Sequence, residues 1–190
     1  MAASLDIIII ATNNFSIHKI VKYMNEFYDL EIQISKITLI DNWLWEGERE
    51  LSVSETIDCC LMNGKIVVVD LKSSLFKDLG IFLEKDDGKY IYTFWINTET
   101  YSELDTDTWN KDIYLKIFSG IEQITKEFGY RVDTIATGIE TNLVYQKDRK
   151  EMIKKSENIK AWAFDESIIT DDLLEFNHSK IGDKDIYIGK

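Results

Sequence analysis

The sequence has no proline at any of its 190 positions, although average usage of about 5% predicts roughly nine. Arginine is nearly as rare and occurs only as Arg49, Arg131 and Arg149, whereas isoleucine, lysine and asparagine are abundant. This composition is typical of an AT-rich bacterial coding sequence. It indicates where the chain comes from and says nothing about its function.

Cysteine and histidine are also scarce, with two of each. Cys59 and Cys60 are adjacent in a segment with a helical pattern, where a disulfide between neighbours would distort the backbone, so we expect reduced thiols packed in the core. His18 and His178 show no ligand spacing to these cysteines, which argues against a metal site. Because no G-x-S-x-G sequence surrounds any serine and no histidine is suitably placed, a catalytic triad is not expected.

Long apolar runs and closely spaced glycines are missing as well. The longest apolar run, residues 7–11, is far shorter than the roughly 20 residues that a membrane helix needs. The first residues lack a basic segment, so we expect no secretory signal and a cytoplasmic protein. The turn over residues 12–14 contains no glycine to cradle a phosphate. We therefore expect neither a cofactor nor a metal ion.

Acidic residues are the clearest excess in the composition. The chain has 34 Asp and Glu against 22 Lys and Arg, which gives a formal net charge of −12. A charge of this sign opposes direct binding to nucleic-acid phosphates and to anionic membrane surfaces. It favours a basic protein as the partner.

The pattern of apolar residues predicts one α+β domain over residues 1–190, built on a mixed, mainly antiparallel sheet. A strand over 5–11, a helix over about 14–28 and a strand over 30–34 predict a β-α-β start. A short helix over about 53–63 follows, with a capping box at residues 52–55 and Gly64 at its end.

The clearest local signal is a central β-hairpin over residues 80–97, in which Gly88 supplies the turn. An acidic loop over 98–107 leads to one long packing helix that ends at Gly129. The other predicted elements are strands over 65–71, 130–137, 143–146, 159–164 and 185–188, and helices over 148–157 and 171–176.

Acidic and aromatic residues occur together in two segments. The first contains Trp43, Trp45, Glu46 and Glu48, and the second contains Tyr101, Glu103, Asp105, Asp107, Trp109 and Asp112. Trp and Tyr often dominate the binding energy of protein interfaces, and charge of one sign speeds association with an oppositely charged partner. We therefore predict these residues as a partner-binding site. The alternative is that the tryptophans belong to the core and the acids keep the protein in solution.

A small acidic globule with such segments and no catalytic motif resembles, in its character along the whole chain, the immunity proteins of bacterial polymorphic-toxin and contact-dependent inhibition systems. The resemblance implies a non-catalytic inhibitor that binds a cognate toxin domain, often a basic nuclease, and covers its active site.

Two alternatives remain open. Carboxylates such as Asp105 and Asp107 allow a carboxylate- or metal-dependent hydrolase or transferase. The other is an acidic DNA mimic that blocks a restriction or repair enzyme, although the lysines over residues 147–155 weaken it.

Overall fold

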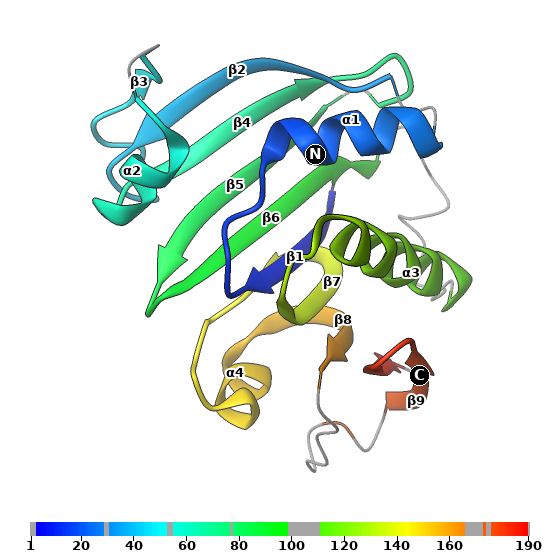
Figure 1. The fold of residues 1–190 in the computed structure, drawn as a ribbon. Helices are drawn as coiled ribbons and strands as arrows, with labels where there is room; N and C mark the ends of the chain where they lie inside the picture. The colour runs from blue at the N-terminus through cyan, green and yellow to red at the C-terminus, as the bar shows by residue number, and fades with distance from the viewer. Residues whose placement is uncertain are drawn as a thin grey trace.

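A computed structural model describes residues 3–28, 31–52, 55–76, 78–98, 111–165, 173 and 176–189. In these residues the chain forms ten strands, which make one sheet, and four helices, so the fold is α+β and mostly sheet (Figure 1). The helices are α1 (Ile17–Tyr28), α2 (Ile57–Met62), α3 (Lys111–Phe128) and α4 (Arg149–Lys155). The strands are β1 (Ser4–Ala11), β2 (Gln33–Ile40), β3 (Arg49–Glu50), β4 (Ile66–Lys72), β5 (Leu79–Asp86), β6 (Lys89–Asn97), β7 (Val132–Asn142), β8 (Glu157–Phe164), β9 (Phe176–Ile181) and β10 (Lys184–Gly189).

The strands lie in the order β3-β2-β4-β5-β6-β1-β7-β8-β10-β9 across the sheet. Every described pair is antiparallel, so the sheet is not the mixed one that the sequence predicts. The predicted β-α-β start is not confirmed as a unit of neighbouring strands. Strands β4, β5 and β6 lie between β1 and β2, because the hairpin strand β6 pairs with β1 instead.

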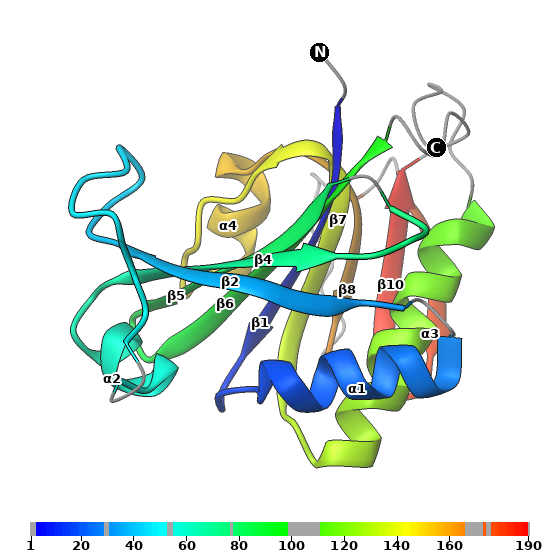
Figure 2. The same ribbon diagram turned by 90° about the horizontal axis from the view of Figure 1, so that it is seen from above.

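The sheet is covered on both faces. Figure 2 shows α1, α2 and α3 on one side, here called the inner face, and α4 on the other, here called the outer face. Because neighbouring side chains of a strand point to opposite faces, Ile9 of β1 joins the inner core, whereas Ile8 and Ile10 join the outer core. The run of isoleucines in β1 is what a strand buried on both faces requires.

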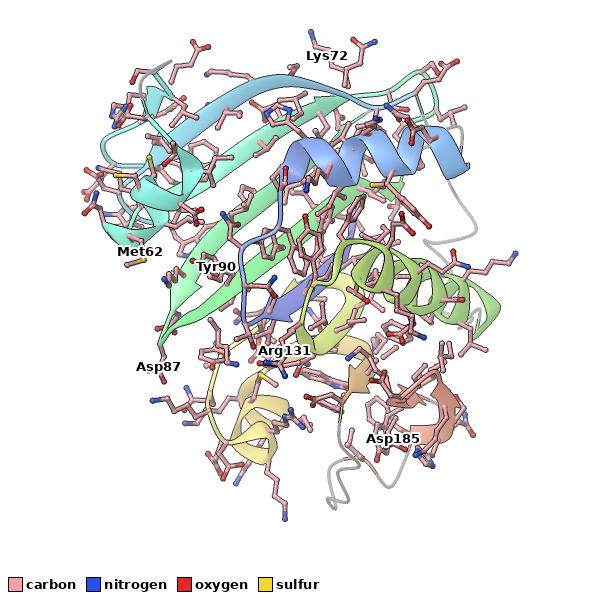
Figure 3. All side chains as sticks on the ribbon, viewed as in Figure 1. Met62, Lys72, Asp87, Tyr90, Arg131 and Asp185 are labelled. Atoms are coloured by element: carbon pink, nitrogen blue, oxygen red, sulfur yellow. The ribbon has the colours of Figure 1, made fainter. Side chains whose placement is uncertain are left out.

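The predicted hairpin is confirmed. Strands β5 and β6 pair along their whole length, and Asp87 and Gly88, with φ of +47° and +79°, form the two-residue turn (Figure 3). Positive φ at both positions defines the type I′ turn, whose twist matches that of antiparallel strands. Gly64 and Gly129 also have positive φ just after α2 and α3, as predicted.

The predicted start of the short helix is wrong. Helix α2 begins after Thr56, whose side chain accepts a hydrogen bond from the backbone N–H of Cys59 at 3.3 Å. Glu55 does accept hydrogen bonds from Ser52, but its carboxylate also binds the Arg49 guanidinium at 2.6 and 2.5 Å. These contacts hold Glu55 outside the helix, so the capping role passes to Thr56.

Both cysteines are free thiols. Cys60 is buried in the inner core, as predicted, and burial raises the pKa of its thiol. Cys59, the preceding residue on α2, is exposed, so the packing prediction holds for one cysteine of the pair.

Helix α3 packs its apolar stripe, which includes Tyr114, Phe118 and Ile121, against the inner face, as predicted. In the described parts of the chain, no helix is both long enough and apolar enough to span a membrane.

Several predicted boundaries differ from the structure. The strand predicted over 30–34 lies at 33–40, and β7 continues to residue 142. The strand predicted over 143–146 is irregular chain, and the edge strand β9 is not predicted. The predicted loop over 98–107, apart from Thr98, and most of the predicted helix over 171–176 lie outside the described residues.

The same substitution at two leucines tests this assignment of the core. Leu83 is fully buried on the inner face, whereas Leu44 is 81% exposed. We expect Leu83→Ala to lower the free energy of unfolding by about 2–5 kcal/mol, because it leaves a cavity. Leu44→Ala should change it by no more than about 0.5 kcal/mol. Urea unfolding measures both, and equal losses would contradict the fold described here.

Candidate functional site

A cleft of about 690 Å³ lies on the outer face of the sheet. Strands β1, β5 and β6 supply its floor, and the end of β7 lines it on one side. Trp43, from the loop over residues 41–48 between β2 and β3, lines it on the other. Figure 2 shows this loop, at the left beyond the end of β2, and α4 on the same side of the sheet.

The cleft is lined by carboxylates and aromatic rings. The carboxylates belong to Asp6, Glu84 and Glu140, and the rings to Trp43, Phe82 and Trp95. None of the described residues that line the cleft is Lys, Arg or His. The described part of the cleft therefore concentrates negative charge beside aromatic surface and supplies no counter-charge of its own.

The aromatic rings form a continuous row. The ring of Trp43 meets Phe82 edge-on at a centroid distance of 5.3 Å, and Phe82 stacks on Trp95 at 6.2 Å. Trp95 pairs with Gly80 on the neighbouring strand, and a Cβ atom at Gly80 would lie only 2.7 Å from the indole. The missing side chain at Gly80 thus lets the Trp95 ring lie across the strand beside it.

The indole nitrogen of Trp95 is buried without a hydrogen-bond partner among the described residues. An unpaired N–H of this kind costs free energy in the folded state. The indole N–H of Trp95 could therefore donate a hydrogen bond to a bound molecule.

Asp6 holds one end of the cleft together. Its side chain is buried and accepts hydrogen bonds from the Ser4 hydroxyl at 2.9 Å and from the Thr141 N–H and hydroxyl at 2.7 and 3.0 Å. Burial raises its pKa, although these hydrogen bonds act in the opposite direction. Asp6 therefore ties the start of β1 to the end of β7, and its oxygens are largely occupied.

Glu84 is the less satisfied carboxylate at the other end. Among described residues, its one hydrogen bond comes from the Trp43 indole N–H at 3.3 Å. Burial raises the pKa of Glu84, the bond from Trp43 lowers it, and the charge of Asp86 raises it further. Glu84 thus has free acceptor positions that face the cleft, whose described lining contains no basic residue.

The two carboxylates do not form a close pair. Asp6 lies opposite Trp95 of β6, and Trp95 lies opposite Gly80 of β5, which is two strands away from β1. Glu84 is four residues further along β5 than Gly80. Ideal strand spacings put the two Cα atoms roughly 16 Å apart. The negative charge is therefore distributed along the cleft.

The first predicted cluster lies in the loop over 41–48. Its three adjacent apolar residues are open to solvent, with Trp43 50% exposed, Leu44 81% and Trp45 47%. Trp45 has a φ of +61°, which is uncommon for a residue with a side chain. Of the predicted residues in this loop, Trp43 alone lines the cleft.

The predicted acids of this loop make local contacts instead. The Glu46 carboxylate accepts a hydrogen bond from the Asn42 side chain at 2.6 Å. Glu48 lies 3.9 Å from the ammonium group of Lys36. Neither lines the cleft.

The second predicted cluster falls outside the described part of the chain. This applies to Tyr101, Glu103, Asp105, Asp107 and Trp109. Asp112 belongs to α3, but its side chain is also outside the description.

Sequence reasoning missed Asp6, Glu84, Glu140, Phe82 and Trp95. A signal was present for Asp6, because it is the one acid in an otherwise apolar strand. Glu84 gave a weaker signal, because it follows the apolar residues 81–83 but is itself followed by Lys85 and Asp86. An isolated charge at a strand position next to buried neighbours favours a functional or structural role over a solvated face. The predicted clusters are acids that lie close together in loops, whereas Asp6 stands alone in a strand.

The histidines take no part in the cleft. His18 is exposed on α1, and His178 on β9 bonds Asp185 of β10 at 2.7 Å and stacks on Tyr187 (Figure 3 labels Asp185). Within the described residues, no group of three or more His, Cys, Asp or Glu side chains is arranged to hold a metal ion.

Comparisons with known proteins returned nothing for this chain: no family model matches it, and neither a curated protein nor a solved structure shows significant similarity. The function is therefore inferred from the geometry of the chain itself.

The raised pKa of Glu84 predicts a pH-dependent stability. A carboxylate whose pKa is raised in the folded state stabilises the fold fully below its unfolded pKa of about 4, and this contribution is lost as the pH rises through the folded pKa. The glutamine of Glu84→Gln does not titrate. The free energy of unfolding of this variant, minus that of the unmodified protein, should therefore be more positive at pH 7 than at pH 4. Urea unfolding at both values measures the difference.

The matched control for this experiment is Glu48→Gln, which removes the same charge from an exposed position. Any change in its free energy of unfolding measures the effect of removing one negative charge from a chain whose net charge is −12. If the two variants showed the same change between pH 4 and pH 7, burial of Glu84 would not be its cause.

Proposed function

We propose that this protein is a non-catalytic inhibitor of the immunity-protein type, which binds a basic toxin domain and blocks its active site. A basic side chain of the partner enters the cleft on the outer face. The observation that carries this proposal is the presence of three carboxylates in one aromatic-walled cleft whose described lining contains no basic residue. A cytoplasmic location is part of the proposal.

A partner lysine or arginine suits this cleft for two physical reasons. An ammonium or guanidinium group makes charge-assisted hydrogen bonds to carboxylates, which are stronger than neutral ones. Over the faces of Trp43 and Trp95 it also gains cation–π attraction. Glu84 has free acceptor positions for such a group, and a bound cation would lower its raised pKa.

The loop over 41–48 supplies an adjoining contact surface. Leu44 and Trp45 are exposed next to Trp43, and large apolar or aromatic side chains of this kind act as anchors at interfaces. The net charge of −12 accelerates the approach of a basic partner. Together these features support stoichiometric binding, in which the toxin's basic active site is occluded by acids in place of nucleic-acid phosphates.

A carboxylate-dependent enzyme is the second candidate. The observation that favours it is the raised pKa of Glu84 within a cleft, since general acids are often tuned in this way. The two candidates differ in what happens to the partner. An inhibitor leaves its partner chemically intact, whereas an enzyme that acts on it changes the partner's mass, which mass spectrometry detects.

The first binding prediction concerns the partner itself. The product of the gene immediately upstream is the candidate, and we expect it to be captured in a pull-down and to lose activity at equimolar ratio. Affinity should fall as salt increases, because the association is driven by opposite charges. An absence of binding at both low and moderate salt would refute the proposal for this partner.

Glu84→Gln should weaken this complex about tenfold or more, because it removes one charge of a desolvated pair. Glu48→Gln, which changes an exposed acid outside the cleft, should weaken it less than about threefold. Isothermal titration calorimetry measures both. Equal effects would show that only net charge matters and that the cleft does not bind the partner.

The two tryptophans of the loop give a second matched pair. Trp43 lines the cleft and contacts Phe82, whereas Trp45 is equally exposed but lies outside the lining. We expect Trp43→Ala to raise the dissociation rate of the complex at least about tenfold, and Trp45→Ala to raise it less. Surface plasmon resonance separates the rates. A larger effect at Trp45 would move the binding surface from the cleft to the outer side of the loop.

A further inference from the structure

The inner face of the sheet holds a second cavity, on the opposite face from the cleft proposed to bind the partner. Of the described lining residues, the two have Trp95 in common. It has a volume of about 290 Å³ and lies between the sheet and helices α1 and α3. Figures 1 and 2 both show these two helices on the same side of the sheet. Ile7 and Phe94 line it from the sheet, Met24 from α1, and Ile117 and Ile124 from α3.

This space is too large to be an ordinary packing defect. Protein interiors contain few voids larger than a water molecule, and an engineered apolar cavity of about 150 Å³ is already enough to bind benzene. Here the volume is roughly twice that. An apolar space of this size that is open to solvent leaves apolar surface in contact with water, and a bound apolar molecule would cover that surface.

Water is a poor occupant of this cavity. A buried water needs two to four polar partners, and the lining is almost entirely apolar. Thr125 supplies a hydroxyl, but that group already donates a hydrogen bond to the Glu122 carbonyl at 2.8 Å.

The cavity is also accessible from outside. Met24, Phe94, Ile117 and Ile124 are only partly buried, although they pack against the inner core. Small-molecule sites are typically concave and lined mainly by apolar side chains, as this cavity is.

One charged side chain lines the cavity. Lys116 of α3 is exposed and forms no ion pair with any residue in the described part of the chain. Its neighbours Ile117 and Gly120 also line the cavity, so the ammonium group is tethered beside the apolar space. A ligand that fits both features has an apolar chain and a negatively charged head.

We propose that this cavity binds a free medium-chain carboxylate, with the alkyl chain between α1, α3 and the sheet and the carboxylate paired with Lys116. A methylene group takes up about as much space as a water molecule, so the cavity has room for a chain of about ten carbon atoms. Binding is driven by burial of the chain and oriented by the single ion pair.

Decanoate is the probe, and calorimetry together with the shift in melting temperature measures its binding. We expect decanoate to bind and stabilise the protein, hexanoate to bind more weakly because it buries less apolar surface, and tetradecanoate to bind more weakly because it exceeds the cavity. An absence of binding by all three would overturn the proposal.

Charge and shape are tested by separate variants. Lys116→Gln should weaken decanoate binding about tenfold and leave binding of the neutral analogue decanol unchanged. Lys22→Gln, on the exposed side of α1 beside Glu26, is the control and should change neither. If Lys116→Gln left decanoate binding unchanged, the assignment of the head group to Lys116 would be wrong.

Ile124→Trp places a larger side chain in the cavity and should weaken decanoate and decanol alike, about tenfold. Ile124→Leu preserves the volume and should bind both as the unmodified protein does. Melting curves of the free variants establish that each is folded. Full binding by a folded Ile124→Trp protein would show that the ligand occupies another site.

Discussion

Strand β1 lies in the middle of the sheet, hydrogen-bonded to β6 along one side and to β7 along the other. Its isoleucines are divided between two hydrophobic layers, so the strand is removed from water on both faces. A strand buried on both faces needs other elements packed over each face. Helices α1, α2 and α3 cover the inner face, and α4 with its neighbouring chain covers the outer face. The acidic cleft and the apolar cavity lie on opposite faces of the sheet at this strand.

The cavities differ in chemistry because the strands alternate. On the inner face, Ile7 of β1 and Phe94 of β6 line an apolar space, whereas on the outer face Asp6 and Trp95, one residue removed in each strand, line the acidic cleft. A one-residue shift of register would exchange the two sets. The precise pairing of β1 with β6 is therefore what keeps carboxylates and apolar side chains in separate sites. The raised pKa values of Asp6 and Glu84 reflect the cost of holding charge on that outer face.

The candidate site was predictable only in part. Trp43 stood out in the sequence as an aromatic residue among acids, and it does line the cleft. Asp6 could be recognised as an isolated acid in a strand, whereas Glu84 stands beside Lys85 and Asp86, and nothing nearby in the sequence places the two in one cleft. Asp6 bonds to Thr141, which is 135 residues away, and Glu84 receives its hydrogen bond from Trp43, 41 residues away. Contacts over such separations depend on strand order, which periodicity does not encode.

The sequence by itself determined those elements whose signals are local. The isoleucine run specified β1, Asp87 and Gly88 specified the hairpin turn, and the apolar stripe that ends at Gly129 specified α3, since backbone conformation and side-chain period act within a few residues. Tertiary structure alone decided that β6 separates β1 from β2, and that the polar segment 176–181 becomes an edge strand by pairing with β10. It also decided which acids are exposed and which line a cleft, because that depends on what packs over each face of the sheet.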